Sequence, residues 1–197
     1  MIVVVDLPCL GGGITKPHRH GHVHLHGVSK VRVSHHGHGV GERHTAEGPG
    51  YTEFGKLMFI DEELKTAGRF PEFAYGKNFP WPKEIRFLKE RVEAQTGLVF
   101  GTCVCIWYPD GNIGVDYHSD QPAFGDTKVL PSISLGGERK FQLRENATGK
   151  VFEKRLETGS MIIMGEYCQE RYEHCLPEDP ECTEGRINLT FRQVGYD

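Results

Sequence analysis

Residues 98–112 read Leu-Val-Phe-Gly-Thr-Cys-Val-Cys-Ile-Trp-Tyr-Pro-Asp-Gly-Asn, an apolar run that ends in a turn. The run is rich in β-branched and aromatic side chains, which favour a strand. Proline, aspartate, glycine and asparagine in succession are typical of a tight turn. This stretch therefore predicts one strand and the turn that leads out of it.

Short strands of the same kind follow this turn along the chain. They are expected at residues 130–135, 139–144, 151–156, 161–164 and 186–192. Glycine-rich turns separate several of them, and many short strands divided by turns predict an antiparallel sandwich or barrel. The sequence thus indicates a mainly β fold.

Helices are expected upstream of residue 98. Residues 82–96 are the best candidate, because apolar side chains recur on one face, a proline opens the segment and Gly97 closes it. Residues 61–67 predict a shorter helix that ends at Gly68. The proline-rich residues 69–82 predict a loop or hairpin between the two helices.

The composition is that of an ordinary globular protein. The chain has 197 residues, 38% of them hydrophobic and 25% charged, which suits one domain with a sizeable core. No apolar run approaches the ~20 residues of a membrane span, and the apolar start is too short for a secretory signal. The six cysteines form no Cys-x-x-Cys pair, which favours buried, reduced thiols. We therefore expect an intracellular protein that has no membrane partner.

The net charge argues against a protein that binds nucleic acid over its whole surface. The formal charge is −4 at pH 7, so any contact with phosphates requires a local basic patch. Two groups of residues are candidates, namely residues 83–91 and the set Arg139, Lys140 and Arg144. Such groups are more often solvated faces than binding sites.

Histidine placement divides the chain in two. Nine of the eleven histidines lie between His18 and His44, in a glycine-rich segment, and the other two are His118 and His174. A histidine-rich tract can bind Zn, Ni or Cu, but this one lacks the apolar side chains of a core. We expect residues 1–50 to be a disordered extension and residues 51–197 to be the folded domain.

His118 and Asp120 are a candidate pair of metal ligands. Residues two apart at a strand end point to the same side, so one imidazole and one carboxylate can reach a common ion. A third ligand must come from elsewhere, and His174 is the only other histidine outside the N-terminal tract. Two histidines and one carboxylate are the ligands of non-haem Fe(II) oxygenases. Alone, the His-x-Asp spacing is a weak signal, and a surface histidine beside a surface aspartate would normally be the favoured interpretation.

The strand expected at residues 186–192 bears a second candidate site. On an extended chain Arg186, Asn188, Thr190 and Arg192 share one face, and apolar residues share the other. Guanidinium groups bind carboxylates through paired hydrogen bonds, so this face suits a dicarboxylate co-substrate beside a metal. An ordinary half-buried strand with a polar outer face would show the same alternation. The functional interpretation is favoured because iron ligands and arginines occur together in this order.

Several motifs together resemble the AlkB family of Fe(II)/2-oxoglutarate dioxygenases, from about residue 69 to residue 194. The most specific is Arg186-x-Asn-x-Thr-Phe-Arg192, standing after His118-x-Asp120 and His174. The others are Tyr108-Pro-Asp-Gly, Ile133-Ser-Leu-Gly, Arg139-Lys-Phe, Gly159-Ser-Met-Ile-Ile-Met and Gln169…Tyr172-Glu-His174…Pro177. Pro71-Glu-Phe-Ala-Tyr75-Gly76 also resembles the family's nucleotide-recognition segment.

This resemblance implies a double-stranded β-helix, or jelly roll, that holds Fe(II) at its mouth. His118, Asp120 and His174 would be the catalytic iron ligands. In the family, iron, O2 and 2-oxoglutarate oxidise an N-methyl group on a base, with release of succinate, CO2 and formaldehyde. The resemblance thus implies an enzyme that demethylates alkylated nucleic acid.

The resemblance also assigns the co-substrate contacts. Arg186 would pair with the distal carboxylate of 2-oxoglutarate, with help from Tyr108 and Asn188. Arg192 would lie near the carboxylate at the metal end. One family feature is absent, because Ile106 stands where an asparagine usually reaches the co-substrate. One donor is therefore missing or replaced.

The expected substrate contacts are Tyr75, Gly76, Lys77 and Trp81. A base extruded from a duplex stacks between aromatic rings, and a lysine can approach its phosphate. Any one of these aromatics is more simply explained as a cover for the core. We expect N-alkylated bases of the 1-methyladenine or 3-methylcytosine type, in single-stranded or short duplex DNA or RNA, and a monomeric enzyme.

The sequence indicates the substrate less specifically than it indicates the metal. Many DNA-repair members have an acidic residue two positions after the iron-binding aspartate, and Pro122 stands there in this chain. A 2-oxoglutarate-dependent hydroxylase or demethylase of a protein or small molecule is therefore the alternative. A third hypothesis is a metal-binding or storage protein built around the histidine-rich tract.

Overall fold

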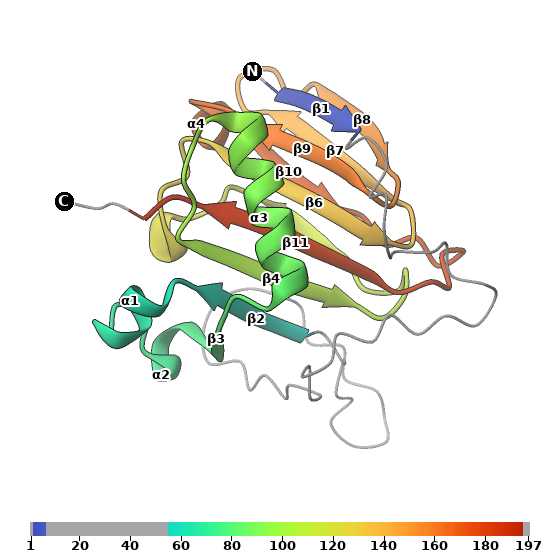
Figure 1. The fold of residues 1–197 in the computed structure, drawn as a ribbon. Coiled ribbons are helices and arrows are strands. Elements are labelled where there is room, and N and C mark those ends of the chain that lie inside the picture. The colour runs from blue at the N-terminus through green and yellow to red at the C-terminus, as the bar shows by residue number, and fades with distance from the viewer. Residues whose placement is uncertain (1, 7–54, 195–197) are drawn as a thin grey trace.

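Short strands make up most of the protein, and the computed structural model describes residues 2–6 and 55–194 (Figure 1). The strands are β1 (Ile2–Asp6), β2 (Gly55–Ile60), β3 (Asn78–Pro80), β4 (Thr102–Tyr108), β5 (Val115–His118), β6 (Leu130–Gly136), β7 (Arg139–Glu145), β8 (Val151–Leu156), β9 (Ser160–Met164), β10 (Tyr172–Leu176) and β11 (Arg186–Arg192). The helices are α1 (Glu62–Thr66), α2 (Glu72–Tyr75), α3 (Lys83–Thr96) and α4 (Cys168–Arg171), with a 3-10 turn at Pro122–Phe124.

The strands form two sheets. The larger sheet has seven strands in the order β1-β9-β6-β11-β4-β2-β3, and the smaller has four in the order β5-β10-β7-β8. From β4 to β11 the chain passes back and forth between them, so that each sheet receives four of these eight strands. This is the eight-stranded jelly roll, which confirms the predicted mainly β, double-stranded β-helix fold. The topology places β11, the last strand, between β6 and β4 near the centre of the larger sheet.

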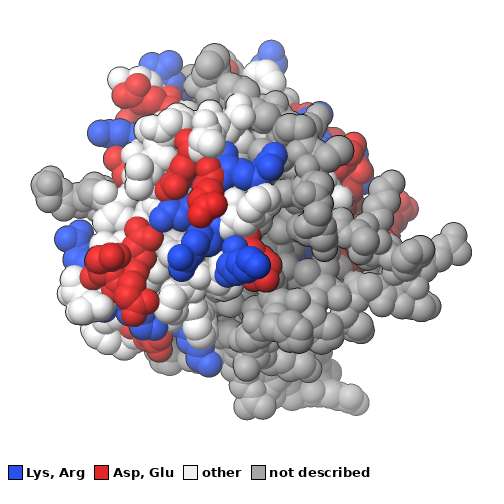
Figure 2. Space-filling model, viewed as in Figure 1, with Lys and Arg blue, Asp and Glu red and all other residues white. Residues whose placement is uncertain are grey.

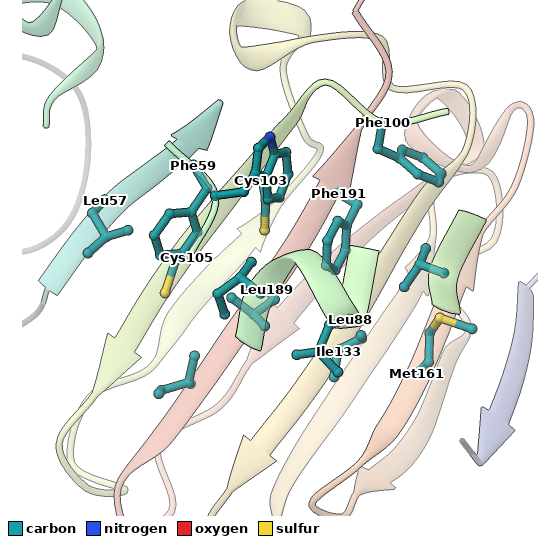
Figure 3. Packing of buried hydrophobic residues seen from close by; sticks show 14 residues of the cluster. Leu57, Phe59, Leu88, Phe100, Cys103, Cys105, Ile133, Met161, Leu189 and Phe191 are labelled. Carbon is teal, nitrogen blue, oxygen red and sulfur yellow. The ribbon is translucent and has the colours of Figure 1, made fainter. Parts of the chain in front are cut away.

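Helix α3 lies across the outer face of the larger sheet and forms the main core with it (Figures 1 and 3). Leu88 of the helix packs in one cluster with Leu189 and Phe191 of β11. Trp81, just before the helix, stacks on Phe191 with ring centroids 6.2 Å apart and planes 2° apart. Each large apolar side chain removed from water in this way stabilises the fold by roughly 1.5–3 kcal/mol.

The two faces of β11 follow the predicted alternation. Ile187, Leu189 and Phe191 belong to the core beneath α3. Arg186 and Arg192 point to the opposite side, toward the smaller sheet, and both are buried. The polar side of β11 is therefore enclosed between the sheets and is not an outer face.

The predicted long helix is confirmed, and the segment before it differs from the prediction. Helix α3 spans Lys83–Thr96, and Gly97 ends it in the left-handed conformation with φ 71°. The loop predicted for residues 69–82 contains the short helix α2 and strand β3. Proline at the start of α2 presets the backbone angle, and Gly76, with φ 81°, ends the turn.

Five strands have no counterpart among the predicted elements, namely β1, β2, β3, β5 and β10. Strand β10 is short and mixes charged with apolar residues, so its pairing with β5 and β7 depends on distant contacts. Strand β1 falls within residues 1–50 and pairs with β9 at the edge of the larger sheet. The histidine-rich tract, residues 18–44, lies outside the described residues.

The candidate basic groups do not form a continuous basic patch. The face that carries α3 shows lysine and arginine intermixed with aspartate and glutamate (Figure 2). Arg139 is fully buried, whereas Lys140 and Arg144 form ion pairs with Glu153 and Glu173. Residues 83–91 are thus part of a solvated face of mixed charge.

The cysteines agree with the sequence expectation. The five within the described ranges are free thiols, and four of them are buried. Among the described residues, no helix is both long and apolar enough to cross a membrane.

The core contact between β11 and α3 predicts a large stability difference between two phenylalanines. Phe191→Ala should lower the free energy of unfolding by roughly 3–5 kcal/mol, because Phe191 is fully buried and its loss leaves a cavity. The matched change Phe87→Ala, at a side chain that is 48% exposed on α3, should cost less than about 1 kcal/mol. Urea denaturation measures both, and similar losses would contradict this description of the core.

Candidate metal and co-substrate site

Strand pairing in the smaller sheet brings the two histidines together. His118 is the last residue of β5 and lies directly opposite His174 of β10. Their ring centroids are 4.3 Å apart. Asp120 follows β5 by two residues, and its carboxylate lies on the same side as the two imidazoles. Residues far apart in sequence are thus gathered by one antiparallel pairing.

These three side chains form a compact set of ligand atoms. One atom from each of His118, Asp120 and His174 lies within 4.8 Å of the other two. His174 Nε2 lies 3.7 Å from Asp120 Oδ2. Two imidazole nitrogens and a carboxylate oxygen at this spacing match the facial triad of non-haem Fe(II).

Hydrogen bonding orients one histidine, and burial sets the charge of the other. His118 Nδ1 lies 2.7 Å from the main-chain carbonyl oxygen of Asp116, which only accepts, so Nδ1 is the donor and Nε2 is the nitrogen left to face a metal. Burial lowers the pKa of His174 to about 4, so its ring is neutral at pH 7. Metal binding needs neutral imidazole, and His174 meets that condition without losing a proton.

Asp120 is oriented by an arginine and a glutamine. Arg192 Nη2 donates to Asp120 Oδ1 at 2.7 Å, which leaves Oδ2 directed toward His174. The main-chain N–H of Asp120 donates to Gln169 Oε1 at 2.8 Å. Gln169 stands on α4, which directly precedes β10 and its His174, and therefore couples the two ligand-bearing segments.

Arg186 is a buried cation whose hydrogen-bond partners are neutral groups. Its Nη2 donates to Ser134 Oγ and to Asn188 Oδ1, both at 2.8 Å, and its guanidinium lies 5.3 Å from the Tyr108 ring. Its Nε has no hydrogen-bond partner, and burial lowers its pKa to about 10. A buried guanidinium costs free energy unless an anion balances it. The site therefore suits a carboxylate at Arg186, as 2-oxoglutarate would provide.

The predicted co-substrate residues come together in two clusters. Arg186, Tyr108 and Asn188 lie at one end, where the Tyr108 side chain is buried and hydrogen-bonds to Arg186. Arg192 lies at the other end and contacts Asp120, together with the main-chain carbonyl of Gln121 at 2.6 Å. Arg192 thus orients the metal carboxylate in addition to lying at the metal end.

The predicted substrate residues are divided between two places. Tyr75 packs edge-on against Phe124, with centroids 5.6 Å apart, in the turn that follows the His-x-Asp segment. Trp81 lies in the core on the far face of the larger sheet, where its Nε1 donates to Asp61. This packing gives Trp81 a core role, and we omit it from the substrate contacts proposed below.

The structure gives a role in the site to polar residues that the sequence analysis did not assign to it. Ser134 and Ser132 of β6 hold Arg186 and Asn188, and Ser134 was present in one of the recognised motifs. Arg139 donates to the carbonyls of Asp110, Ile113 and Pro177, and so ties the loop before β5 to the segment after β10. A serine or arginine on a strand carries no sequence signal that separates such a role from simple exposure.

A cavity of about 350 Å³ lies beside the metal ligands without including them. Its lining is mainly apolar and comes from β7, β8, β9, β10 and the α4 segment. Phe141 lines this cavity and stacks on His174, with centroids 5.6 Å apart and planes 26° apart. None of the triad or co-substrate residues lines it, so it is distinct from the site formed by Asp120 and Arg186.

Comparison with known proteins agrees with this geometry. The profile described as the 2OG-Fe(II) oxygenase superfamily matches residues 24–192. The protein named alpha-ketoglutarate-dependent dioxygenase alkB homolog 3 is 35% identical over 127 residues in Rattus norvegicus and 34% in Homo sapiens. The Bos taurus protein named DNA oxidative demethylase ALKBH2 is 29% identical over 126 residues.

These matches confirm the AlkB resemblance and, at the level of the family, Fe(II) and 2-oxoglutarate as cofactors. They cover 58–59% of this chain. The chain spans 43–45% of the length of these relatives.

The contact between Gln169 and Asp120 predicts a positioning effect on metal binding. Gln169→Leu should weaken Mn(II) affinity roughly tenfold or more, because groups that orient a ligand typically contribute 10- to 100-fold to affinity. Calorimetry in the absence of oxygen measures this constant. Gln95→Leu, at an exposed position of α3, is the matched control and should bind Mn(II) as the unchanged protein does. Equal Mn(II) affinities in the two variants would contradict a positioning role for Gln169.

Proposed function

Because the chain belongs to the 2OG-Fe(II) oxygenase superfamily, we propose that it is an Fe(II)/2-oxoglutarate-dependent dioxygenase that demethylates N-alkylated bases in nucleic acid. The observation that carries this proposal is a compact His118, Asp120 and His174 triad beside the buried guanidinium of Arg186. A metal-storage site has no need for a buried cation that awaits a carboxylate. The AlkB relatives support a nucleic-acid substrate, since two of them are named for oxidative demethylation of DNA.

The residues of the chain divide the work between binding and orientation. The triad holds Fe(II), and Arg186 with Tyr108 receives the distal carboxylate of 2-oxoglutarate. Arg192 keeps Asp120 Oδ1 occupied, so the same carboxylate faces the metal through Oδ2. Burial of these groups excludes water, which strengthens each electrostatic contact.

The bound cofactors supply the oxidising chemistry: one oxygen atom of O2 goes to succinate as CO2 leaves 2-oxoglutarate, and the other hydroxylates the N-methyl group. The hydroxymethyl product then loses formaldehyde and leaves the unmodified base. The substrate must therefore place its methyl group beside the triad, on the side that the three protein ligands leave open. A base inside a duplex meets this requirement only after extrusion from the stack.

Aromatic and basic groups near the mouth support a nucleotide substrate. Tyr75 packs beside Phe124, and Phe73 on the same short helix is 93% exposed, so its ring is available to a base. Gly76 and Lys77 follow directly, and the Lys77 side chain is exposed beside them. Because the net charge is −4, we favour single-stranded or short duplex DNA or RNA over long duplex.

A second candidate function keeps the same cofactors and changes the substrate. Pro122 stands at the start of the 3-10 turn beside the triad, where it offers no acidic contact to a damaged base. This feature favours a hydroxylase or demethylase of a protein or small molecule. The histidine-rich metal-storage hypothesis concerns residues outside the described part of the chain and leaves Arg186 without a purpose.

A formaldehyde assay separates these functions. With Fe(II) and 2-oxoglutarate, oligonucleotides that carry 1-methyladenine or 3-methylcytosine should release formaldehyde together with succinate. Asp120→Ala should reduce the rate at least about a hundredfold, because it removes an iron ligand and leaves the buried Arg192 without its carboxylate partner. Asp116→Asn, which keeps the carbonyl that orients His118, is the matched control and should retain activity.

Two outcomes would contradict the proposal. Succinate formation that methylated oligonucleotides do not stimulate would favour the protein or small-molecule substrate. Full activity of Asp120→Ala would contradict the assignment of the triad as the metal site.

A further inference from the structure

Lys56, the second residue of β2, is a partly buried cation at the metal end of the site. Its Cα lies opposite that of Ile106 on β4, an apolar residue in the row that also contains the polar Asn188 and Ser134. We infer that the Lys56 ammonium binds the metal-end carboxylate of 2-oxoglutarate and so replaces the donor that Ile106 lacks. This inference rests on 2-oxoglutarate as the co-substrate and is independent of which substrate is oxidised.

Strand register points Lys56 into the space between the sheets. One row across the larger sheet consists of Ser134, Asn188, Ile106 and Lys56, on β6, β11, β4 and β2 in turn. Side chains directly opposite one another in antiparallel strands lie on the same face. Ser134 and Asn188 face Arg186 in the enclosed space, so Lys56 enters the same space from the next strand beyond Ile106.

Aromatic contacts locate the ammonium near Asp120. Lys56 Nζ lies 3.9 Å from the centroid of the Phe124 ring. The guanidinium carbon of Arg192 lies 5.7 Å from the same centroid, and Arg192 bonds directly to Asp120. The lysine thus spans from the row of Ile106 to the metal end, away from the position of Arg186.

The charge balance around this lysine favours an anion. Burial lowers the pKa of Lys56, and the nearby charge of Arg192 lowers it further, whereas Asp120 partly opposes the change. The Asp120 carboxylate is already occupied by Arg192 at 2.7 Å. Within the described ranges, no carboxylate forms an ion pair with Lys56. A carboxylate between Lys56 and Arg192 would relieve the repulsion between two partly desolvated cations.

The register also separates this lysine from the distal end of the co-substrate. Arg186 lies opposite Tyr108, two positions along the strands from the row that contains Ile106. A dicarboxylate extended along β11 therefore meets Arg186 at one end and the Lys56 and Arg192 pair at the other. Arg186 and Lys56 would therefore bind different carboxylates of the co-substrate. This difference gives the inference a specific test.

Binding of two 2-oxo acids to the Mn(II)-loaded protein tests this inference without turnover. Lys56→Met should weaken both 2-oxoglutarate and 2-oxobutyrate, which lacks the distal carboxylate, by a similar factor of roughly ten or more. Arg186→Met should weaken 2-oxoglutarate far more than 2-oxobutyrate. Lys83→Met, at an exposed position on α3, is the matched control and should change neither constant. Calorimetry gives the constants for Mn(II) and for both acids.

A second variant separates the loss of the Lys56 donor from an effect of Lys56→Met on local packing. Adding Ile106→Asn to Lys56→Met should recover at least part of the lost 2-oxo acid affinity, because an amide there lies in the same row. Unchanged affinity for both acids in Lys56→Met would overturn the inference. The inference would also be overturned if Lys56→Met weakened Mn(II) binding as much as 2-oxo acid binding. A loss confined to oligonucleotide binding would overturn it as well, because that result would assign Lys56 to a phosphate contact. Failure of the demethylation assay alone would leave these binding results intact.

Discussion

Strand β11 is the constraint on which both the core and the site depend, because each of its faces is committed to a different environment. Its apolar face packs beneath α3, and its polar face lies between the sheets with Arg186 and Arg192 at opposite ends. A shift of one residue in register would exchange the two sets and bury the arginines in the apolar core. The large apolar contact with α3 therefore fixes where the co-substrate arginines point.

Hydrogen bonds among its own residues hold the polar space between the sheets in place. Arg186 is held by Ser134 and Asn188, whereas Asp120 is held by Arg192 and Gln169. Holding buried charges in fixed positions costs several kcal/mol per ion when no counter-charge is present. A metal and a dicarboxylate that bind only the folded state should therefore stabilise this protein in proportion to their concentration. The enclosed charges lower the stability of the fold and are the source of its affinity for anions.

The sequence predicts the features that depend on local periodicity and misses those that depend on distant pairing. Alternation on β11 and the helical pattern of α3 are both confirmed, because each is encoded within one segment. The opposition of His118 and His174 requires the pairing of β5 with β10, and β10 is too short and polar to be predicted. Lys56 carries no pattern of its own, and Gln169 belongs to a recognised motif that assigns it no role, because the contacts of both come from other elements. Trp81 lies in a segment predicted as a loop and was an expected substrate contact, yet its stack on Phe191 places it in the core.

The central claim is that the triad and the arginines together bind Fe(II) with 2-oxoglutarate. The most direct measurement is the visible charge-transfer absorption that appears when a 2-oxo acid chelates Fe(II), recorded without oxygen. The account predicts this band for the unchanged protein and its loss in Asp120→Ala at the same concentrations. Absence of the band in the unchanged protein, or its persistence at full strength in Asp120→Ala, would contradict the account.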